Sequence, residues 1–204
     1  MKQKIGIFGG TFNPVHLGHL IMAQDALEAF ELSKVLFVPS SKPPHKTGTA
    51  LAPAEHRAAM LLNALERSTH FEVCEMELVR GGTSYTVDTL RELRKKYVDR
   101  DLFFIIGSDS LTELHTWKEI NQILELCTIV TMARPGYDPI SIKYSDINLP
   151  DPWPERLLTN VISMHQLNIS SSDIRHRIAE GMRISHLLPQ SVDSYISEHR
   201  LYRL

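Results

Sequence analysis

Short apolar segments alternate with helical patterns along most of this 204-residue chain, and this alternation constrains the possible fold more than any other feature. Helical patterns occur at residues 20–30, 53–66, 85–97 and 120–126. Apolar runs predict buried strands at residues 4–8, 34–38, 71–76, 102–106, 128–132 and 161–165. This order predicts an α/β fold, a Rossmann-like doubly wound parallel sheet with helices on both faces.

The length of the chain suits a single domain, which we expect to span residues 1–204. Helical patterns at residues 172–180 and 190–199 predict a small C-terminal helical extension, about residues 171–204, packed on that domain. Proline-rich segments at residues 39–48 and 135–154 predict irregular loops. In a doubly wound sheet, ligands bind beyond the carboxyl ends of the strands, so residues that follow a strand are the candidates for a site.

The segment of residues 9–19 follows the first predicted strand and leads into a helix that we expect to begin near Gly18. It reads Gly-Gly-Thr-Phe-Asn-Pro-Val-His-Leu-Gly-His. Gly9 and Gly10 allow main-chain N–H groups to approach a ligand where a Cβ atom would obstruct it. The helix directs its unpaired N–H groups and positive dipole end to the same place. The segment therefore predicts a phosphate site.

Two histidines stand at the start of this helix. We expect the rings of His16 and His19 to point back over the helix N-terminus and to donate hydrogen bonds to phosphate oxygens, with Gly18 keeping the surface between them open. The His-x-x-His spacing also suits half of a zinc site, but no cysteine or acidic residue lies nearby in the sequence to complete one. Phosphate binding is therefore favoured, and no residue is assigned as a metal ligand.

The charge balance argues against a polymeric partner. Twenty-two basic and 24 acidic side chains give a formal net charge of -2, so no overall basic field favours binding of nucleic acid. No apolar stretch approaches the roughly 18 residues of a membrane span, and no signal-type segment is visible at the N-terminus. The two cysteines, Cys74 and Cys127, are too few for a disulfide framework, so we expect a cytoplasmic protein with reduced thiols. A homo-oligomer is left open.

A hydroxyl-rich segment, residues 169–175, follows the last predicted strand and opens a helix. Ser170 and Asp173 fit a helix-capping pattern, and Arg175 lies close enough to the first turn to reach an anion bound there. Taken by itself, the segment is explained by a capped helix with a solvent-facing arginine. Its position after a strand, on the same rim as the first motif, favours a second phosphate contact.

Two further segments offer contacts for a second ligand. Residues 81–90 approach a helix through glycines and hydroxyls, and N–H groups around Tyr85 and Thr86 suit a carboxylate. The fourth strand ends in a glycine, after which Asp109 can accept hydrogen bonds from ribose hydroxyls. Trp117 would ordinarily fill the core, but the polar run before it predicts a partly exposed ring that stacks on a flat heterocycle.

Additional positive charge surrounds the same predicted rim. His45 and Lys46 lie in the loop after the second strand, and Arg134 follows the fifth strand. Each is more often a solvated side chain when taken alone. Together with the two histidines and Arg175, on a chain of net negative charge, they favour a polyphosphate over a single phosphate.

With these residues assembled, the chain resembles the nucleotidyltransferase superfamily that carries an H-x-G-H motif near the N-terminus and an I-S-S-T-x-I-R motif near the C-terminus. Within it, the chain is similar over its full length to the bacterial nicotinate-mononucleotide adenylyltransferases. The matching segments are G-G-T-F-x-P-x-H-x-G-H at residues 9–19, P-P-H-K at 43–46 and S-Y-T-x-x-T-L at 84–90. Ser172 stands where the C-terminal motif usually has threonine, which keeps the hydroxyl.

The resemblance implies transfer of AMP from ATP to nicotinate mononucleotide, giving deamido-NAD and pyrophosphate in NAD biosynthesis. It implies that His16, His19 and Arg175 are catalytic, with His19 nearest the α-phosphate. The implied ATP-binding residues are Gly9, Gly10, Thr11, His16, Gly18, His19, Gly107, Arg134, Ser171, Ser172 and Arg175. The implied mononucleotide-binding residues are His45, Lys46, Ser84, Tyr85, Thr86, Asp109 and Trp117.

The chemistry of this reaction suits the residues found. A phosphate monoester is already anionic at neutral pH, so the attacking group needs positive donors around it rather than a general base. Within the resemblance, Thr86 and neighbouring N–H groups hold the nicotinate carboxylate while Trp117 stacks on the ring. Mg²⁺ is expected to accompany ATP, held mainly by phosphate oxygens and water.

Other interpretations of the motifs make different demands on the sequence. A phosphopantetheine adenylyltransferase or a cytidylyltransferase would share both phosphate motifs, but residues 84–90 and the pair of Asp109 and Trp117 argue against them. Preference for the amide mononucleotide stays open. A non-catalytic nucleotide sensor could dispense with both histidines and Arg175. A class I aminoacyl-tRNA synthetase carries a similar motif, but this chain is too short for one and lacks a K-M-S-K-S segment.

Overall fold

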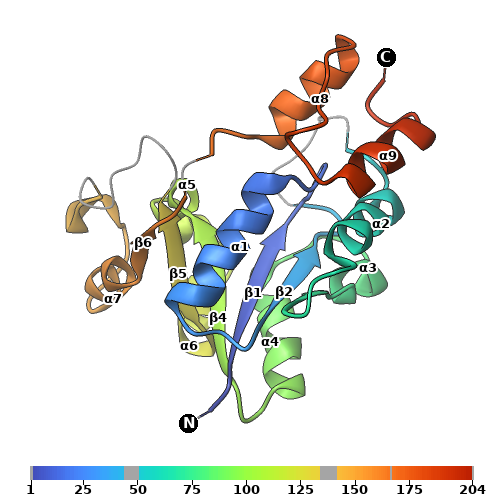
Figure 1. Ribbon diagram of the computed structural model, residues 1–204. Coiled ribbons are helices and arrows are strands. Elements are labelled where there is room, and N and C mark those ends of the chain that lie inside the picture. The colour runs from blue at the N-terminus through green and yellow to red at the C-terminus, as the bar shows by residue number, and fades with distance from the viewer. Residues whose placement is uncertain (1, 44–50, 134–141, 166, 204) are drawn as a thin grey trace.

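A single parallel sheet forms the centre of the molecule (Figure 1). The computed structural model describes residues 2–43, 51–133, 142–165 and 167–203. Within these ranges the strands are β1 (Lys4–Gly10), β2 (Lys34–Pro39), β3 (Phe71–Val73), β4 (Asp101–Gly107), β5 (Thr128–Ala133) and β6 (Val161–Ser163). They pair in parallel in the order β3-β2-β1-β4-β5-β6. This is the doubly wound order, so the predicted fold class is confirmed.

Both faces of the sheet are covered, which explains why its strands are continuous apolar runs. Along β2, Phe37 faces one core while its neighbours Leu36 and Val38 face the other. The first core lies beneath α1 (Leu17–Ala29), α2 (Ala54–Leu65), α8 (Ser171–Ala179) and α9 (Gln190–Glu198). The second lies beneath α4 (Thr86–Lys96), α5 (Ser108–Leu111), α6 (Ile120–Leu126) and α7 (Trp153–Thr159), with the 3-10 turn η1 (Leu114–Thr116).

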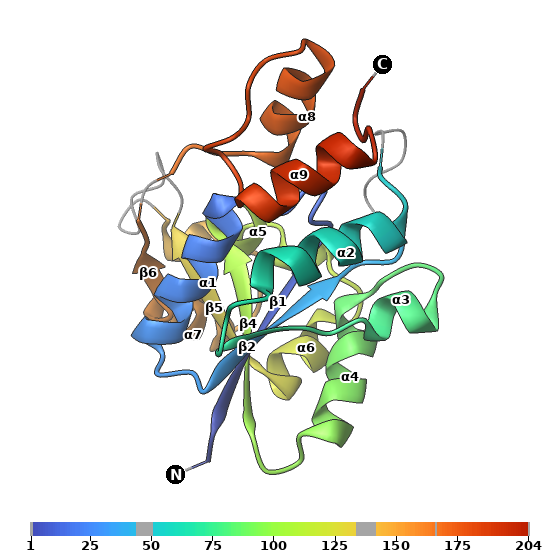
Figure 2. The ribbon, with the colours of Figure 1, turned by 45° about the vertical axis from the view of Figure 1, so that its right-hand side comes forward.

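The C-terminal helices share a core with the sheet. Ile174 of α8 and Val192 and Ile196 of α9 are buried in the same cluster as Met60 and Leu61 of α2. Both views place α9 beside α2 and α8 near the upper ends of the central strands (Figures 1 and 2). This packing brings residues from the end of the chain to the loop that follows β1. None of the helices in the described part of the chain is long and apolar enough to cross a membrane.

The structure departs from the sequence prediction at the edges of the sheet. The strand predicted at residues 71–76 ends at Val73, and the chain then enters a short helix, α3 (Met76–Arg80). The last strand ends at Ser163 rather than residue 165. Each of these strands has a single neighbour, so fewer of its residues are held by pairing.

The loop predicted at residues 135–154 also contains regular structure in its described part, residues 142–154. A 3-10 turn, η3, covers Tyr144–Asp146, and α7 begins at Trp153. Pro152 and Pro154 flank that first residue. Proline is tolerated in the first turn of a helix, where its missing N–H would have no partner, so here the prolines accompany a helix start.

Candidate active site

A cavity of about 400 Å³ opens where β1, β2 and β4 end. Its wall includes Phe8 and Ile106 near the carboxyl ends of β1 and β4, and Ser40 directly after β2. The predicted site residues that line it are Gly9, Gly10, Thr11, His19, Ser84, Thr86, Gly107, Asp109 and Trp117. The structure therefore brings residues predicted for ATP and residues predicted for the mononucleotide into one space, at the sheet edge where doubly wound folds bind ligands.

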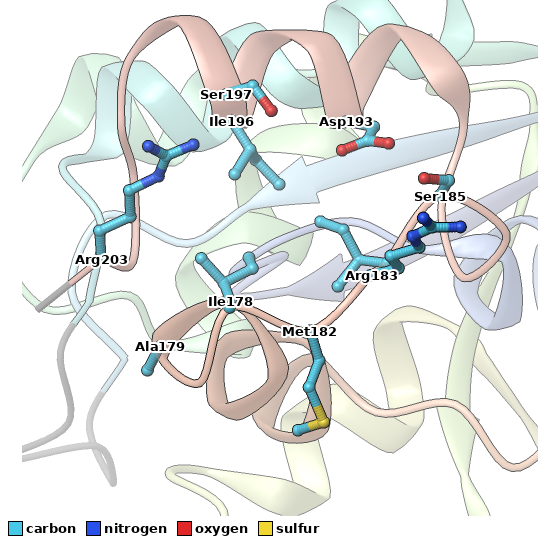
Figure 3. A pocket seen from close by; sticks show the side chains of 11 residues that line it. Ile178, Ala179, Met182, Arg183, Ser185, Asp193, Ile196, Ser197 and Arg203 are labelled. Carbon is cyan, nitrogen blue, oxygen red and sulfur yellow. The ribbon is translucent and has the colours of Figure 1, made fainter.

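A second cavity, of about 430 Å³, lies between α8 and α9 (Figure 3). Ile178 and Ile196 face each other across it, and Arg183 and Arg203 lie on opposite sides. None of the residues predicted from the sequence lines this cavity. The predicted site residues that line a cavity are at the strand ends instead.

The two histidines of the first motif lie one behind the other. His16 is the N-cap residue of α1 and is only 6% exposed, and its ring stacks on that of His19 with centroids 3.7 Å apart. The backbone N–H of His16 donates to Nδ1 of His19 (3.3 Å). Because Nδ1 accepts, Nε2 carries the proton of the neutral His19 ring and is its donor. His19 lines the cavity, and the His16 ring packs against it at the start of α1; phosphate donation by both rings stays a prediction.

The glycines of this loop are closely surrounded by aromatic rings. A Cβ atom on Gly9 would lie 3.3 Å from the ring of Phe104, and one on Gly10 would lie 3.0 Å from the ring of Phe12. A Cβ atom on Gly18 would lie 3.1 Å from the ring of His16. These positions therefore accommodate neighbouring rings, and Gly9 and Gly10 also line the cavity, where approach of their N–H groups to a ligand stays a prediction. Glycine at residue 18 is what allows the His16 ring to fold over the start of α1.

The C-terminal motif holds the first loop from the other side. The Ser170 hydroxyl accepts a hydrogen bond from the Asp173 N–H (3.1 Å), which confirms the predicted cap of α8. Ser171 donates to the carbonyl of Pro14 (2.9 Å), and Nη1 of Arg175 donates to the carbonyl of Asn13 (2.8 Å). The two motifs, more than 150 positions apart, are thus in direct contact.

Ser172 has a different environment from its neighbours. It is exposed, and its hydroxyl lies 3.1 Å from that of Ser170. Neither Ser171, Ser172 nor Arg175 is among the residues that line the cavity. Ser171 and Arg175 instead hold the backbone of the loop after β1, and residues of that loop line the cavity.

The start of α4 forms the opposite wall. Tyr85 is its N-cap residue and Thr86 its first residue. The Ser84 N–H donates to the carbonyl of Lys42, and the Ser84 hydroxyl accepts from the Ser41 N–H, both at 2.9 Å. The Tyr85 ring lies below the ammonium of Lys118, 4.4 Å from its centroid. Thr86 therefore reaches the cavity from a helix start that is tied to the loop after β2.

Two predicted residues approach the cavity from the end of β4. Asp109 is the second residue of α5, whose N-cap residue is Gly107. Trp117 is partly buried, as expected, and meets the Phe104 ring edge to face with centroids 5.9 Å apart. This contact fixes the plane of the indole at the cavity wall. His45, Lys46 and Arg134, also predicted for the rim, lie outside the described residues.

The cavity wall includes a buried carboxylate that the sequence did not single out. Glu77 of α3 is 7% exposed and accepts a hydrogen bond from the Thr89 hydroxyl. Burial raises the pKa of Glu77, while hydrogen bonds from Ser84 and Thr89 and the charge of Arg80 oppose the shift. This carboxylate lines the cavity beside the start of α4.

A buried arginine behind the cavity was also missed. Arg57 is 1% exposed, and its guanidinium donates to the carbonyls of Ala52, Thr11, Ser40 and Ser41 at 2.7 to 3.0 Å. Burial lowers the pKa of Arg57 below its ordinary value, yet a guanidinium remains charged in proteins. Arg57 shares the buried face of α2 with Leu61 and Leu65. Its helical spacing with these two leucines could have indicated in the sequence that Arg57 is buried.

Known proteins resemble this chain over nearly its whole length. The family model described as cytidylyltransferase-like matches residues 7–177. A relative from Desulfitobacterium hafniense is 42% identical over 203 residues, covering 99% of this chain and 97% of its own. Another from Thermus thermophilus is 43% identical over 202 residues, covering 98% and 100%. Both are named probable nicotinate-nucleotide adenylyltransferase.

The fold is shared with solved structures as well. Plasmodium falciparum nicotinic acid mononucleotide adenylyltransferase complexed with NaAD superposes with a TM-score of 0.76 at 18% sequence identity. The match covers 98% of this chain and 97% of that one.

Proposed function

The chain belongs to the cytidylyltransferase-like family, and from this membership and the site we propose that it transfers AMP from ATP to nicotinate mononucleotide. The products are deamido-NAD and pyrophosphate. One observation carries the proposal: the glycine loop with His19 and the group of Thr86, Asp109 and Trp117 line the same cavity. An adenylyl transfer needs both substrates in one space.

In the proposed reaction, an oxygen of the mononucleotide phosphate attacks the α-phosphorus of ATP. A new P–O bond forms, the bond between the α-phosphorus and the bridging oxygen to the β-phosphate breaks, and pyrophosphate leaves with that electron pair. The attacking phosphate is already anionic, so no side chain has to remove a proton. The protein contributes in-line positioning and donors for the charge that develops.

The donors for ATP come from α1, His19 and α8. The first turn of α1 has no acidic residue, so its N–H groups and positive dipole end are not offset by a carboxylate there. The Nε2–H of His19 donates to the α-phosphate. The described contact of Arg175 uses Nη1, and a guanidinium has five N–H donors, so Arg175 can hold the loop and reach a triphosphate at the same time. His16 holds the His19 ring in position.

The mononucleotide binds at the opposite wall. The N–H groups at the start of α4 and the Thr86 hydroxyl hold the nicotinate carboxylate, Trp117 stacks on the pyridine ring, and Asp109 accepts hydrogen bonds from the ribose. The absence of a dedicated arginine among the described residues of this wall fits a single negative charge better than a polyphosphate.

Magnesium is proposed to arrive with ATP. Mg²⁺ takes oxygen ligands, retains several waters and commonly binds through substrate phosphates, where it neutralises charge on the departing pyrophosphate. The donor set fits that arrangement: the cavity offers Asp109 and hydroxyls, and the described residues contain no group of three or more His, Cys, Asp or Glu side chains that would hold an ion alone.

The free thiols of Cys74 and Cys127 favour a reducing compartment, and we propose the cytoplasm.

A pyrophosphate-release assay tests the proposal. Purified protein with ATP and Mg²⁺ is supplied separately with nicotinate mononucleotide, its amide analogue or phosphopantetheine. We expect the highest kcat/KM with nicotinate mononucleotide. Faster release with phosphopantetheine would assign the chain to a different transferase, and ATP binding with no release for any acceptor would favour a nucleotide sensor.

A further inference from the structure

We propose that Arg57 is a positioning residue for adenylyl transfer, which holds the two lips of the cavity at a fixed separation. The first lip consists of Gly10, the last residue of β1, and Thr11 after it. The second consists of Ser40 and Ser41 after β2. This inference rests on the proposed function, because that function is what requires two substrates to be aligned across the cavity.

The geometry of the guanidinium joins the two lips directly. Nη1 of Arg57 donates both to the carbonyl of Thr11 (2.9 Å) and to the carbonyl of Ser40 (2.7 Å). Nη2 donates to the carbonyl of Ser41 (3.0 Å). Nε donates to the carbonyl of Ala52, two residues before α2 begins, which fixes the guanidinium itself (3.0 Å). A planar group with this fork of donors sets distance and orientation together.

The connection continues from the second lip to the opposite wall. The carbonyl of Ser41 accepts from Arg57, and the N–H of Ser41 donates to the hydroxyl of Ser84. Ser84 directly precedes the N-cap residue of α4, and Thr86 follows it on the cavity wall. Arg57 is thus linked by consecutive hydrogen bonds to the helix start that is proposed to hold the nicotinate carboxylate.

The burial of Arg57 is unusual for a residue with only a packing role. A buried charge is costly unless it is paired, and in the described part of the chain no carboxylate forms an ion pair with Arg57. Backbone carbonyls alone accept its hydrogen bonds there. The buried positive charge lies directly behind Thr11, to whose carbonyl it donates, so it also favours a polyanion at the first lip.

Misalignment of the lips would affect turnover more than binding. Each substrate would keep its own contacts, but the attacking oxygen and the α-phosphorus would no longer meet in line. A misplacement of about 1 Å can reduce a rate about 100-fold. The expected signature of losing Arg57 is therefore a fall in kcat, with smaller changes in the KM values of ATP and nicotinate mononucleotide.

Three variants of the full chain test this role. Arg57→Met keeps the length of the side chain without donors or charge, and Arg57→Lys keeps the charge without the fork. Arg94→Met is the matched control, because Arg94 also donates to backbone carbonyls, those of Arg100 and Leu126, at the other end of the sheet. Steady-state kinetics give kcat and both KM values, and calorimetric titration with ATP gives the number of intact sites.

We expect kcat of Arg57→Met to fall at least about tenfold, with ATP binding still close to one site per chain, and Arg57→Lys to recover part of the loss. Arg94→Met should lower the melting temperature and leave kcat unchanged. Two results would overturn the proposal: wild-type kcat in Arg57→Met, or a loss of kcat matched by an equal loss of ATP sites. If Arg57→Met does not fold, the same comparison is made with Arg57→Lys. An inactive wild-type protein would instead count against the proposed function.

Discussion

The two halves of the cavity are built around buried charges of opposite sign. Behind the first loop lies the guanidinium of Arg57, and the α1 helix that starts there has no acid in its first turn. The opposite wall contains the buried carboxylate of Glu77, and α4 carries Asp88 in its first turn. The first half suits several negative charges. The second disfavours the accumulation of negative charge, so stacking and hydrogen bonds must supply most of its affinity for the singly charged nicotinate group of the proposed substrate.

This difference predicts which kinetic constant each half controls. Changes in the half with Arg57 should lower turnover, because charge develops there during the reaction. Changes in the half with Glu77 should weaken binding of the mononucleotide and leave ATP binding intact.

The largest effect is expected from His19→Ala. The substitution removes the Nε2–H donor proposed for the α-phosphate, and removal of one such donor typically lowers kcat by about 100-fold or more. Steady-state kinetics on purified variant, with circular dichroism to establish folding, measure it. Near-normal turnover in a folded variant would contradict a role for His19 in the reaction and the proposed kinetic difference between the two halves.

A smaller effect, on one substrate, is expected from Trp117→Ala. Loss of ring stacking should raise the KM of nicotinate mononucleotide about tenfold and spare the KM of ATP. Trp153→Ala is the matched control, because Trp153 packs with Arg156 on α7 and does not line the cavity. A Trp117 variant impaired for ATP alone would reverse the assignment of the walls.

A comparison of two glycines should separate geometry from stability. Gly18→Ala places a Cβ atom against the His16 ring, which should displace the His19 ring stacked on it and lower kcat several-fold. Gly81→Ala meets nothing within 4 Å but strains a residue with φ of +67°, and should lower the free energy of unfolding by about 1 kcal/mol without changing kcat. The contrast fails if Gly81→Ala reduces turnover more than Gly18→Ala.

The smallest effect is a pH dependence of stability. Because the pKa of Glu77 is raised in the folded protein, its folded state is favoured while the carboxyl is protonated, and that advantage is lost as the pH rises through the folded pKa. Glu77→Gln lacks this loss, so its free energy of unfolding should gain on the wild type as pH increases in the mildly acidic range. Urea unfolding from about pH 4 to about pH 7 measures the difference.

Exposed Glu66→Gln controls for the loss of a carboxylate alone. A constant difference between wild type and Glu77→Gln across that range would contradict a raised pKa.

The sequence was sufficient for the centre of the fold and for the contiguous motifs. Apolar runs found the strands because both faces of the sheet are buried, and periodicity found α2 and α4 within a residue or two. It misplaced the end of β3, which pairs with one neighbour, and missed α7, which has prolines at its start. Local patterns carry little information about either.

The residues that hold the site in place were harder to predict from the sequence, because they act through contacts between residues far apart in the chain. The Tyr202 hydroxyl donates to Oδ1 of Asn13 (2.8 Å), 189 positions away, and nothing in the local sequence of either residue indicates it. Burial of Tyr202 beside Arg175 and Arg57 raises its pKa, with both cations opposing the shift. Arg57 and Glu77 were missed for the same reason, since a charge on a helix is usually solvated.

The most direct test of adenylyl transfer follows the α-phosphorus itself. Wild-type protein is incubated with nicotinate mononucleotide and ATP labelled either at the α-phosphorus or at the γ-phosphorus, and the products are separated. We predict that the α label appears in the dinucleotide and the γ label in pyrophosphate, in equal amounts. Transfer of the γ label to the mononucleotide, or release of the α label as AMP without a dinucleotide, would contradict the account.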